Sequence, residues 1–258
     1  MRIMVLVAAL AGALGLVSSA LAAPAKPTVV LVHGAFADSS SWDGVMADLT
    51  RDGYGVVAAA NPLRGAASDA AYVATVVKAV DGPVVLVGHS YGGTVITQAA
   101  VGASNVKGLV YVSAFAPDVG ETSFGLAGKF PGATLSAALA PPVDLPTGGQ
   151  DLYIRQDRFP AQFAADVPLA KAKLMAAGQR PLTQAAGDEK ITSAGWKTLP
   201  SWFIYGSADL NIPPAAMAFM AERAHARKVV AVPGASHVVM VSHPHEVAAL
   251  IEEAAQSR

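Results

Sequence analysis

Residues 83–100 read PVVLVGHSYGGTVITQAA and contain the clearest structural motif of the 258-residue chain. Its unbroken aliphatic run, Val84 to Val87, is typical of a strand buried on both faces of a parallel sheet, and residues 91–100 follow as a helix. Gly88-His89-Ser90-Tyr91-Gly92 lies between them and matches Gly-x-Ser-x-Gly. In that context the pattern indicates a nucleophile elbow, in which a sharp turn raises a serine hydroxyl above the sheet. We therefore predict Ser90 as a nucleophile; a tight turn without chemistry is the alternative.

Alternating strands and helices continue on both sides of this stretch. Such alternation predicts an α/β fold whose mostly parallel sheet is flanked by helices. Residues 118–197 interrupt it with no clear strand, and a segment of this length is too long for a plain loop. We predict that it forms a helical cap, inserted after the fourth strand of the mature chain. Further strands are predicted at residues 28–32, 56–60, 106–115, 201–205 and 228–232, and helices at 42–49, 69–80, 166–177, 214–224 and 244–255.

The N-terminus has the features of a cleavable export signal. Arg2 is followed by an apolar stretch and by Ala20-Leu21-Ala22, a small-x-small cleavage site. The prediction is a signal peptide at residues 1–22 and a secreted or periplasmic α/β domain at residues 23–258. An uncleaved anchor is the alternative, although the fully apolar part is short for a bilayer-spanning helix.

The composition of the chain limits the classes of partner that it can bind. Apolar residues make up 53% of the chain and charged residues 14%, which excludes a disordered chain. The formal charge is −1 and no basic run occurs, so we expect no nucleic-acid partner. The turn at Ser90 lacks the glycine spacing of a dinucleotide site, and no cofactor is expected. We expect a small-molecule substrate and no stable membrane anchor; the oligomeric state is left open.

A serine hydroxyl needs a positioned base, and His237 is our choice among six histidines. It follows the strand at residues 228–232 and the loop Pro233 to Ser236, so it emerges at the same sheet edge as Ser90. The others have simpler explanations. His33 and His89 lie in turns, where a structural hydrogen bond is expected, and His225 lies on a helix exposed to solvent. His243 and His245 lie at the start of a surface helix. Their spacing suggests a metal-binding pair, but no further ligand completes the set.

The acid that orients the base should also follow a strand. Asp209, after the strand at residues 201–205, is preferred, and Asp118 is the rival. An acyl-transfer site also needs two N–H donors for the oxyanion. We assign the Tyr91 amide and the Ala35 amide, with Phe36 as a one-residue alternative to Ala35.

Several of these motifs together resemble the α/β-hydrolase superfamily, from Thr28 to the end of the chain, with the cap matching least. They are Val32-His33-Gly34-Ala35, Trp42, Gly88-His89-Ser90-Tyr91-Gly92-Gly93, Asp209 and Ser236-His237. Within the superfamily the chain is similar to a group of plant methyl-salicylate-type esterases, hydroxynitrile lyases and bacterial secreted esterases. The resemblance implies hydrolysis of esters of small, rather apolar substrates through an acyl-enzyme, without a metal.

Two positions separate esterases from lyases in that group. The lyases carry threonine where this chain has Gly34 and lysine where it has Val238, so the resemblance favours an esterase. We expect Phe36, Phe124 and Val238 to contact the substrate. A lactonase, an amidase, a cofactor-free perhydrolase, a hydroxynitrile lyase and a non-catalytic ligand-binding relative are the alternatives.

Overall fold

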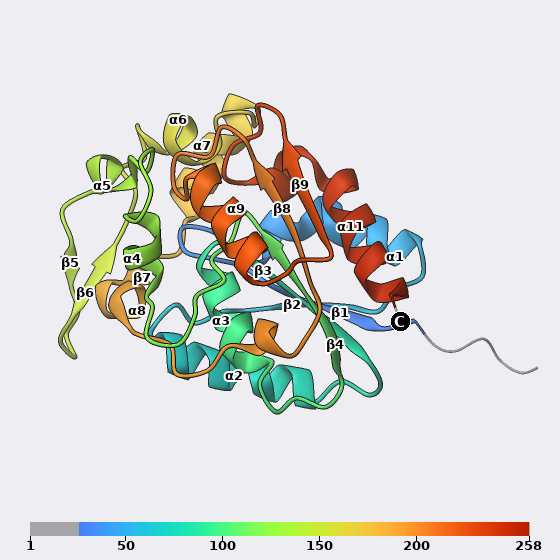
Figure 1. Ribbon diagram of the computed structural model, residues 1–258. Helices are drawn as coiled ribbons and strands as arrows, with labels where there is room; N and C mark the ends of the chain where they lie inside the picture. Colours follow the sequence, from blue (N-terminus) through green and yellow to red (C-terminus); the bar gives the residue numbers. More distant parts are fainter. Residues whose placement is uncertain (1–25, 258) are drawn as a thin grey trace, which may run out of the picture.

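The structure is a computed structural model that describes residues 26–257. The aliphatic runs form a six-stranded parallel sheet in the order β2-β1-β3-β4-β8-β9 (Figure 1). Its strands are β1 (Thr28–Val32), β2 (Val56–Ala59), β3 (Val84–His89), β4 (Val106–Val112), β8 (Ser201–Gly206) and β9 (Lys228–Val232). The predicted α/β fold is confirmed. The predicted signal peptide lies outside the described residues, so it stays a prediction, as does export.

Helices cover both faces of the sheet. On one face α1 packs against α11, and on the other α2 packs against α3 (Figure 1). The bounds are α1 (Asp43–Arg51), α2 (Ala66–Lys78), α3 (Tyr91–Ala99), α9 (Pro214–Arg223), α10 (Val239–Ser242) and α11 (Pro244–Gln256), with a 3-10 turn η1 (Ser39–Trp42) before α1. The chain runs from β1 to β2 and then crosses to β3 on the other side of β1. This reversal of strand order opens a crevice at the carboxyl ends of β1 and β3, where ligands of α/β proteins bind.

The segment between β4 and β8 forms a layer beside the carboxyl ends of the strands (Figure 1). It contains helices and also a small antiparallel sheet, β5-β6-β7, which the expectation of a strandless cap missed. These strands have only two or three residues, too few for an alternating pattern. The elements are α4 (Ser123–Ala127), α5 (Leu135–Ala138), β5 (Val143–Asp144), β6 (Gln150–Leu152), α6 (Phe159–Phe163), α7 (Leu169–Gly178), β7 (Leu182–Thr183), α8 (Gln184–Asp188) and η2 (Gly195–Lys197).

This cap is fastened to the core at the turn before α2. Thr183 donates its Oγ1 proton to the Arg64 carbonyl at 2.9 Å, and the Arg64 guanidinium pairs with Asp151 of β6 at 2.6 Å. The Glu189 carboxylate accepts the amide of Ala66, the first residue of α2, at 2.5 Å. A carboxylate at this position satisfies an amide that has no intrahelical partner and complements the helix dipole.

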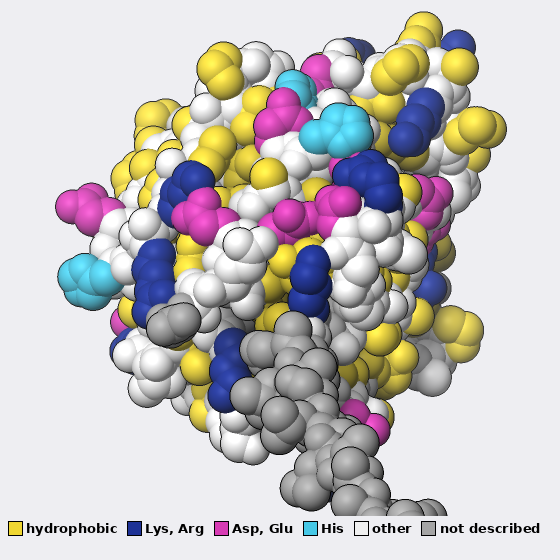
Figure 2. Space-filling view, turned by 90° about the vertical axis from the view of Figure 1, so that its right-hand side faces the viewer, with side chains coloured by type: hydrophobic (Ala, Val, Ile, Leu, Met, Phe, Trp, Pro, Cys, Tyr) yellow, Lys and Arg dark blue, Asp and Glu magenta, His cyan; other side chains and the backbone are white. Residues whose placement is uncertain are grey.

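Figure 2 shows the face on which α1 and α11 lie. Basic and acidic side chains alternate there, with hydrophobic atoms between them. Arg51, for example, pairs with Asp48 at 2.6 Å and with Asp52 at 3.2 Å. None of the helices within residues 26–257 is both long enough and apolar enough to cross a membrane.

Candidate active site

The turn between β3 and α3 holds Ser90 in an unusual backbone conformation. Its φ is 52° and its ψ is −125°, a region that residues other than glycine rarely adopt. Backbone bonds hold it there: the Ser90 amide donates to the Ser113 carbonyl at 3.1 Å, and the Phe115 amide donates to the Ser90 carbonyl at 3.2 Å. Gly92 permits the tight approach of β1, because a Cβ there would lie 2.3 Å from the Val32 carbonyl oxygen. Strain held in this way clusters at functional sites.

A chain of hydrogen bonds runs from this serine to a buried carboxylate. Ser90 Oγ lies 2.9 Å from His237 Nε2, and His237 Nδ1 lies 2.7 Å from Asp209 Oδ2. The side chains of His237 and Asp209 are 1% and 0% exposed. The three residues come from the loops after β3, β8 and β9. The structure therefore brings together the three side chains that sequence reasoning had selected.

Hydrogen bonding of Asp209 fixes the direction of this chain. Its Oδ1 accepts the amides of Asn211 at 2.8 Å and Ile212 at 3.0 Å. An ionised carboxylate only accepts, so His237 Nδ1 is the donor in the bond to Oδ2. His237 Nε2 is then free to accept the proton of Ser90 Oγ. The sequence could not predict the amide bonds from Asn211 and Ile212, because the fold of the loop places these backbone groups.

The rival acid lies elsewhere. Asp118 forms an ion pair with Lys197 at 2.6 Å, and its side chain is 31% exposed. Partial burial opposes its ionisation, but the hydrogen bonds from Lys197 and the Val119 amide and the nearby positive charges together outweigh this and lower the pKa of Asp118. The carboxylate is thus held by a lysine and makes no contact with His237.

Two of the other histidines support the site without joining the chain. The His89 ring lies 4.8 Å from the His237 ring, and its Nε2–H donates to the His237 carbonyl at 3.2 Å. Burial and the neighbouring His237 lower the pKa of His89 well below its usual value, so it stays neutral. His33 is buried too, and its Nδ1–H donates to the Gly34 carbonyl at 2.9 Å. Both fit the structural roles expected for them.

The remaining histidines lie outside the crevice. His245 Nδ1 is 2.5 Å from Asp48, and His243 Nδ1 is 3.7 Å from Asp166. Across residues 26–257, no group of three or more His, Cys, Asp or Glu side chains is placed to hold a metal ion.

Ala35 and Tyr91, whose amides are the candidate oxyanion donors, line the same pocket as Ser90. A Cβ on Gly34 would lie 2.6 Å from Ser90 Cβ and 3.1 Å from the Tyr91 amide nitrogen, so the turn after β1 touches the elbow directly. The Phe36 amide donates to the Arg180 carbonyl at 2.8 Å. The Phe36 amide is therefore already bound, and Ala35 remains the candidate oxyanion donor on this turn.

A buried pair beneath the elbow was missed in the sequence. The Tyr91 hydroxyl donates to Asp69 Oδ2 at 2.8 Å, and the same carboxylate accepts the Arg64 amide at 3.0 Å. Burial raises the pKa of Asp69, and burial together with this carboxylate raises the pKa of Tyr91. The pair anchors the side chain of Tyr91, whose amide is the second candidate oxyanion donor. Asp69 was expected only to begin a helix, and no local pattern links it to Tyr91.

A small apolar pocket of about 30 Å³ lies over Ser90 and His237. Phe36 and Phe124 line it as expected, whereas Val238 is fully buried and is not among its lining residues. Its other walls are Ala35, Tyr91, Phe115, Ser123, Ala127, Leu135, Phe163, Leu182, Asn211 and Ile212. Most of these come from the cap or from loops after strands. Ala35 and Tyr91 were expected at the site from the sequence, whereas the cap residues are placed there by contacts between distant parts of the chain.

Comparisons with known proteins agree with this architecture. The structure is similar to polyneuridine aldehyde esterase, with a TM-score of 0.76 and 21% identity over 88% of this chain and 98% of that one. It is similar to a pyrethroid hydrolase from Sphingobium faniae, with a TM-score of 0.69 and 21% identity over 90% and 98% of the two chains. An extracellular α/β-hydrolase from Paenibacillus gives a TM-score of 0.69 and 21% identity over 90% and 100%.

A search of curated proteins found no match to this chain. The model of the alpha/beta hydrolase family, however, matches residues 29–250, which span the sheet, the cap and all three members of the hydrogen-bonded chain. On the strength of that match and of the fold, this protein is a member of the alpha/beta hydrolase family.

Proposed function

We propose that this protein hydrolyses carboxylic esters of small, rather apolar substrates, with Ser90 as nucleophile, His237 as general base and Asp209 as its orienting acid. One observation carries the proposal: a buried chain of hydrogen bonds runs from Ser90 through His237 to Asp209, at 2.9 and 2.7 Å, beside a pocket that Ala35 and Tyr91 also line. Membership of the alpha/beta hydrolase family supports hydrolytic chemistry in general.

In the first half-reaction Ser90 Oγ attacks the ester carbonyl while His237 Nε2 takes the hydroxyl proton. The carbonyl oxygen becomes an oxyanion, and the amides of Ala35 and Tyr91 stabilise it. Asp209 stabilises the imidazolium that forms. When the C–O bond to the alcohol breaks, His237 returns the proton to the leaving oxygen, and an acyl-Ser90 ester remains.

In the second half-reaction water replaces the alcohol. His237 Nε2 takes one proton from the water, whose oxygen attacks the acyl carbon. The bond to Ser90 Oγ then breaks, and the serine takes the proton back. The products are a carboxylic acid and an alcohol, and the sequence of steps uses no metal and no cofactor.

The pocket favours an apolar ester. No Asp, Glu, Lys or Arg side chain lines it, and Phe36, Phe124 and Phe163 provide aromatic walls. The Gly34 position also argues against a cyanohydrin lyase: a Cβ there would lie 2.7 Å from the His89 carbonyl oxygen and 2.6 Å from Ser90 Cβ. This backbone has no room for a threonine, and Val238 is buried outside the pocket wall.

A fluorophosphonate probe tests the proposal, because it reacts only with an activated serine. We expect stoichiometric labelling at Ser90, identified by peptide mass spectrometry, and hydrolysis of p-nitrophenyl esters by the unlabelled protein. Parallel assays with lactones and anilides distinguish a lactonase and an amidase. Monochlorodimedone with bromide, peroxide and acetate distinguishes a perhydrolase, because the peracid formed oxidises bromide to the brominating species. An unlabelled Ser90 together with ligand binding would favour a non-catalytic relative.

Asp209→Asn is expected to reduce kcat/KM by about 10³- to 10⁴-fold. The asparagine oxygen can keep the two amide bonds from Asn211 and Ile212, which places its NH₂ group toward His237 Nδ1. His237 Nδ1 must then accept, so Nε2 carries the proton and cannot receive one from Ser90. Steady-state kinetics with a p-nitrophenyl ester measures the loss.

Asp118→Asn is the matched control, because it neutralises a carboxylate that pairs with Lys197 and not with His237. We expect it to retain near-normal turnover. A larger loss at Asp118 than at Asp209 would assign the acid to Asp118.

A further inference from the structure

The space directly over Ser90 is small compared with any ester that the family chemistry would process. At about 30 Å³ it has room for water-sized groups only. Two larger cavities adjoin it, one of about 340 Å³ and one of about 220 Å³. The larger one alone falls within the range typical of small-molecule sites.

The larger cavity, here the cap cavity, lies among α4, α5, β6 and α8. It shares Phe124, Ala127, Leu135 and Asn211 with the pocket over Ser90. Beyond these shared walls it is lined by Gly128, by the aliphatic Ala133, Leu139 and Leu152, and by the uncharged polar side chains of Ser136 and Gln184; no charged side chain lines it. The catalytic pocket therefore continues into an apolar space that is large enough for several carbon atoms.

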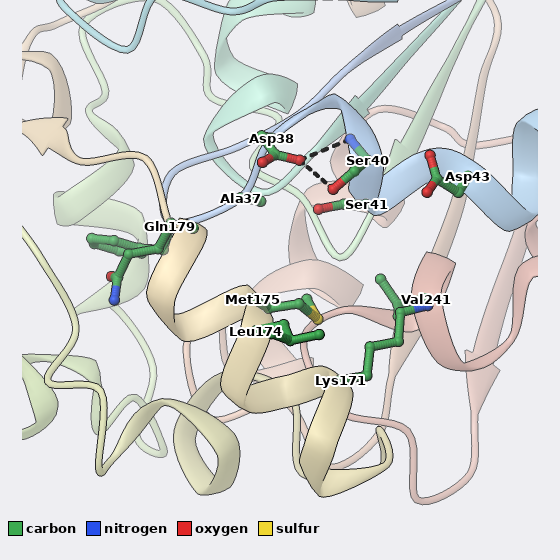
Figure 3. A pocket seen from close by; sticks show the side chains of 12 residues that line it. Ala37, Asp38, Ser40, Ser41, Asp43, Lys171, Leu174, Met175, Gln179 and Val241 are labelled. Carbon is green, nitrogen blue, oxygen red and sulfur yellow. Dashed lines mark hydrogen bonds between the residues drawn. The ribbon is translucent and has the colours of Figure 1, made fainter.

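The smaller cavity, here the α7 cavity, lies on the other side of Phe36, which it shares with the catalytic pocket. Figure 3 shows Asp38, Ser40, Ser41 and Asp43 on one side of it and α7, with Lys171, on the other. The α7 cavity also has apolar walls, among them Leu174, Met175 and Val241, but three charged side chains line it, whereas none lines the cap cavity. A hydrocarbon chain placed in the α7 cavity would displace water from these charged groups, which is costly. An apolar arm of the substrate thus belongs in the cap cavity.

The position of the base decides which arm of the ester this is. Val241, in the helix that directly follows His237, lines the α7 cavity, and no residue of that loop or helix lines the cap cavity. His237 protonates the departing alcohol and deprotonates the incoming water, so both exchange on its side. The acyl group stays attached to Ser90 through both half-reactions and extends the other way.

We propose that the cap cavity is the acyl-chain site, which makes this protein selective for esters of medium-length, unbranched fatty acids. This inference rests on the proposed ester hydrolysis and adds the substrate class. Burying each additional methylene of the chain should raise kcat/KM by up to about fourfold. The wild-type protein is therefore expected to prefer p-nitrophenyl hexanoate and octanoate to the acetate.

Phe124 separates the two spaces, and Gly187 of α8 sets its position. A Cβ on Gly187 would lie 2.2 Å from Phe124 Cε2 and 2.3 Å from Cζ, so the ring rests directly on the glycine backbone. Any side chain at position 187 must push the ring away from α8, toward the spaces that it separates. Gly187 is thus a positioning residue for acyl-length selection.

Filling the cap cavity from its rim tests the proposal. Ser136 and Ala133 are exposed and line the cap cavity but not the pocket over Ser90. Ser136→Trp and Ala133→Trp are each expected to lower the octanoate-to-acetate ratio of kcat/KM by about tenfold or more. Lys171→Trp, which adds the same ring to the α7 cavity, is the matched control and should keep the wild-type ratio.

The Phe124–Gly187 contact provides an independent test. Gly187→Ala should lower the same ratio, and Phe124→Ala combined with it should restore the ratio, because the displaced ring is gone. Circular dichroism and the denaturant midpoint show whether each variant is folded. Since the readout is a ratio within one variant, a partial loss of folded protein cancels.

The outcomes separate this proposal from the one on which it rests. Absence of ester hydrolysis and of Ser90 labelling in the wild type would overturn the proposed function. Ser90-dependent ester hydrolysis whose octanoate-to-acetate ratio is unchanged by Ser136→Trp and Ala133→Trp would overturn the acyl-chain site alone. A ratio changed by Lys171→Trp instead would move the acyl chain to the α7 cavity.

Discussion

Ser90→Ala is expected to lower kcat/KM for p-nitrophenyl esters by on the order of 10⁴- to 10⁶-fold. The variant lacks the atom that forms the acyl-enzyme, and His237 has no hydroxyl to activate. What remains is the binding pocket and the two oxyanion amides, which assist direct attack by water only weakly. Initial-rate assays with purified protein measure the loss, and the fluorophosphonate probe should no longer label the chain.

The fold should survive this change. Ser90 Oγ forms a single side-chain hydrogen bond, to His237, and the backbone bonds that hold the turn do not involve it. The expected change in the free energy of unfolding is about 1 kcal/mol or less. Ser113→Ala is the matched control, since this buried hydroxyl near the elbow has no hydrogen-bond partner in the part of the chain that the structure describes. Near-normal turnover by Ser90→Ala would contradict the mechanism.

The sheet could be predicted because each of its strands has a recognisable pattern in its own short segment of sequence. A strand buried on both faces is an unbroken aliphatic run, and β1 and β3 begin and end within a residue or two of their runs. Because parallel strands end at one edge, the loops after β3, β8 and β9 also indicated which serine, aspartate and histidine would meet. β2 ended one residue early, at Ala59, and β4 ended three residues early, at Val112, because residues 113–115 turn beneath the elbow to bind the Ser90 backbone.

The cap could not be predicted in the same way, because its structure depends on contacts distant in sequence. Its strands pair residues far apart, as in Asp151 with Thr183, and carry no periodic signal of their own. The same limit applies to α2. Tyr72 lies among the apolar residues of this helix yet is 40% exposed, and Asp69 is buried instead. The hydroxyl of Tyr91 and the amides before α2 supply the partners that make burial of Asp69 possible.

His237→Gln is the second substitution expected to have a large effect, a loss of kcat/KM close to that of Ser90→Ala. Glutamine is similar in reach and polarity, but its carboxamide does not take up a proton near neutral pH. It can neither accept the Ser90 proton nor return one to the leaving alcohol. The double variant should therefore lose little more kcat/KM than either single variant, since the residues act as a unit. Kinetics on the two single variants and the double variant measures this non-additivity.

Stability separates the catalytic role of His237 from its structural one. Asp209 is completely buried and accepts three hydrogen bonds, one of them from His237 Nδ1. His237→Asn places an NH₂ group at the position of Nδ1 and keeps that bond, whereas His237→Ala removes it. Both variants should be equally inactive, but the alanine variant should be less stable by about 1–3 kcal/mol in urea unfolding.

His243→Gln, on a residue that contacts Asp166 outside the site, should retain turnover and stability. A large loss at His243 or His245 with little at His237 would place the base elsewhere, and equal stability of the two His237 variants would show that Asp209 does not depend on this bond.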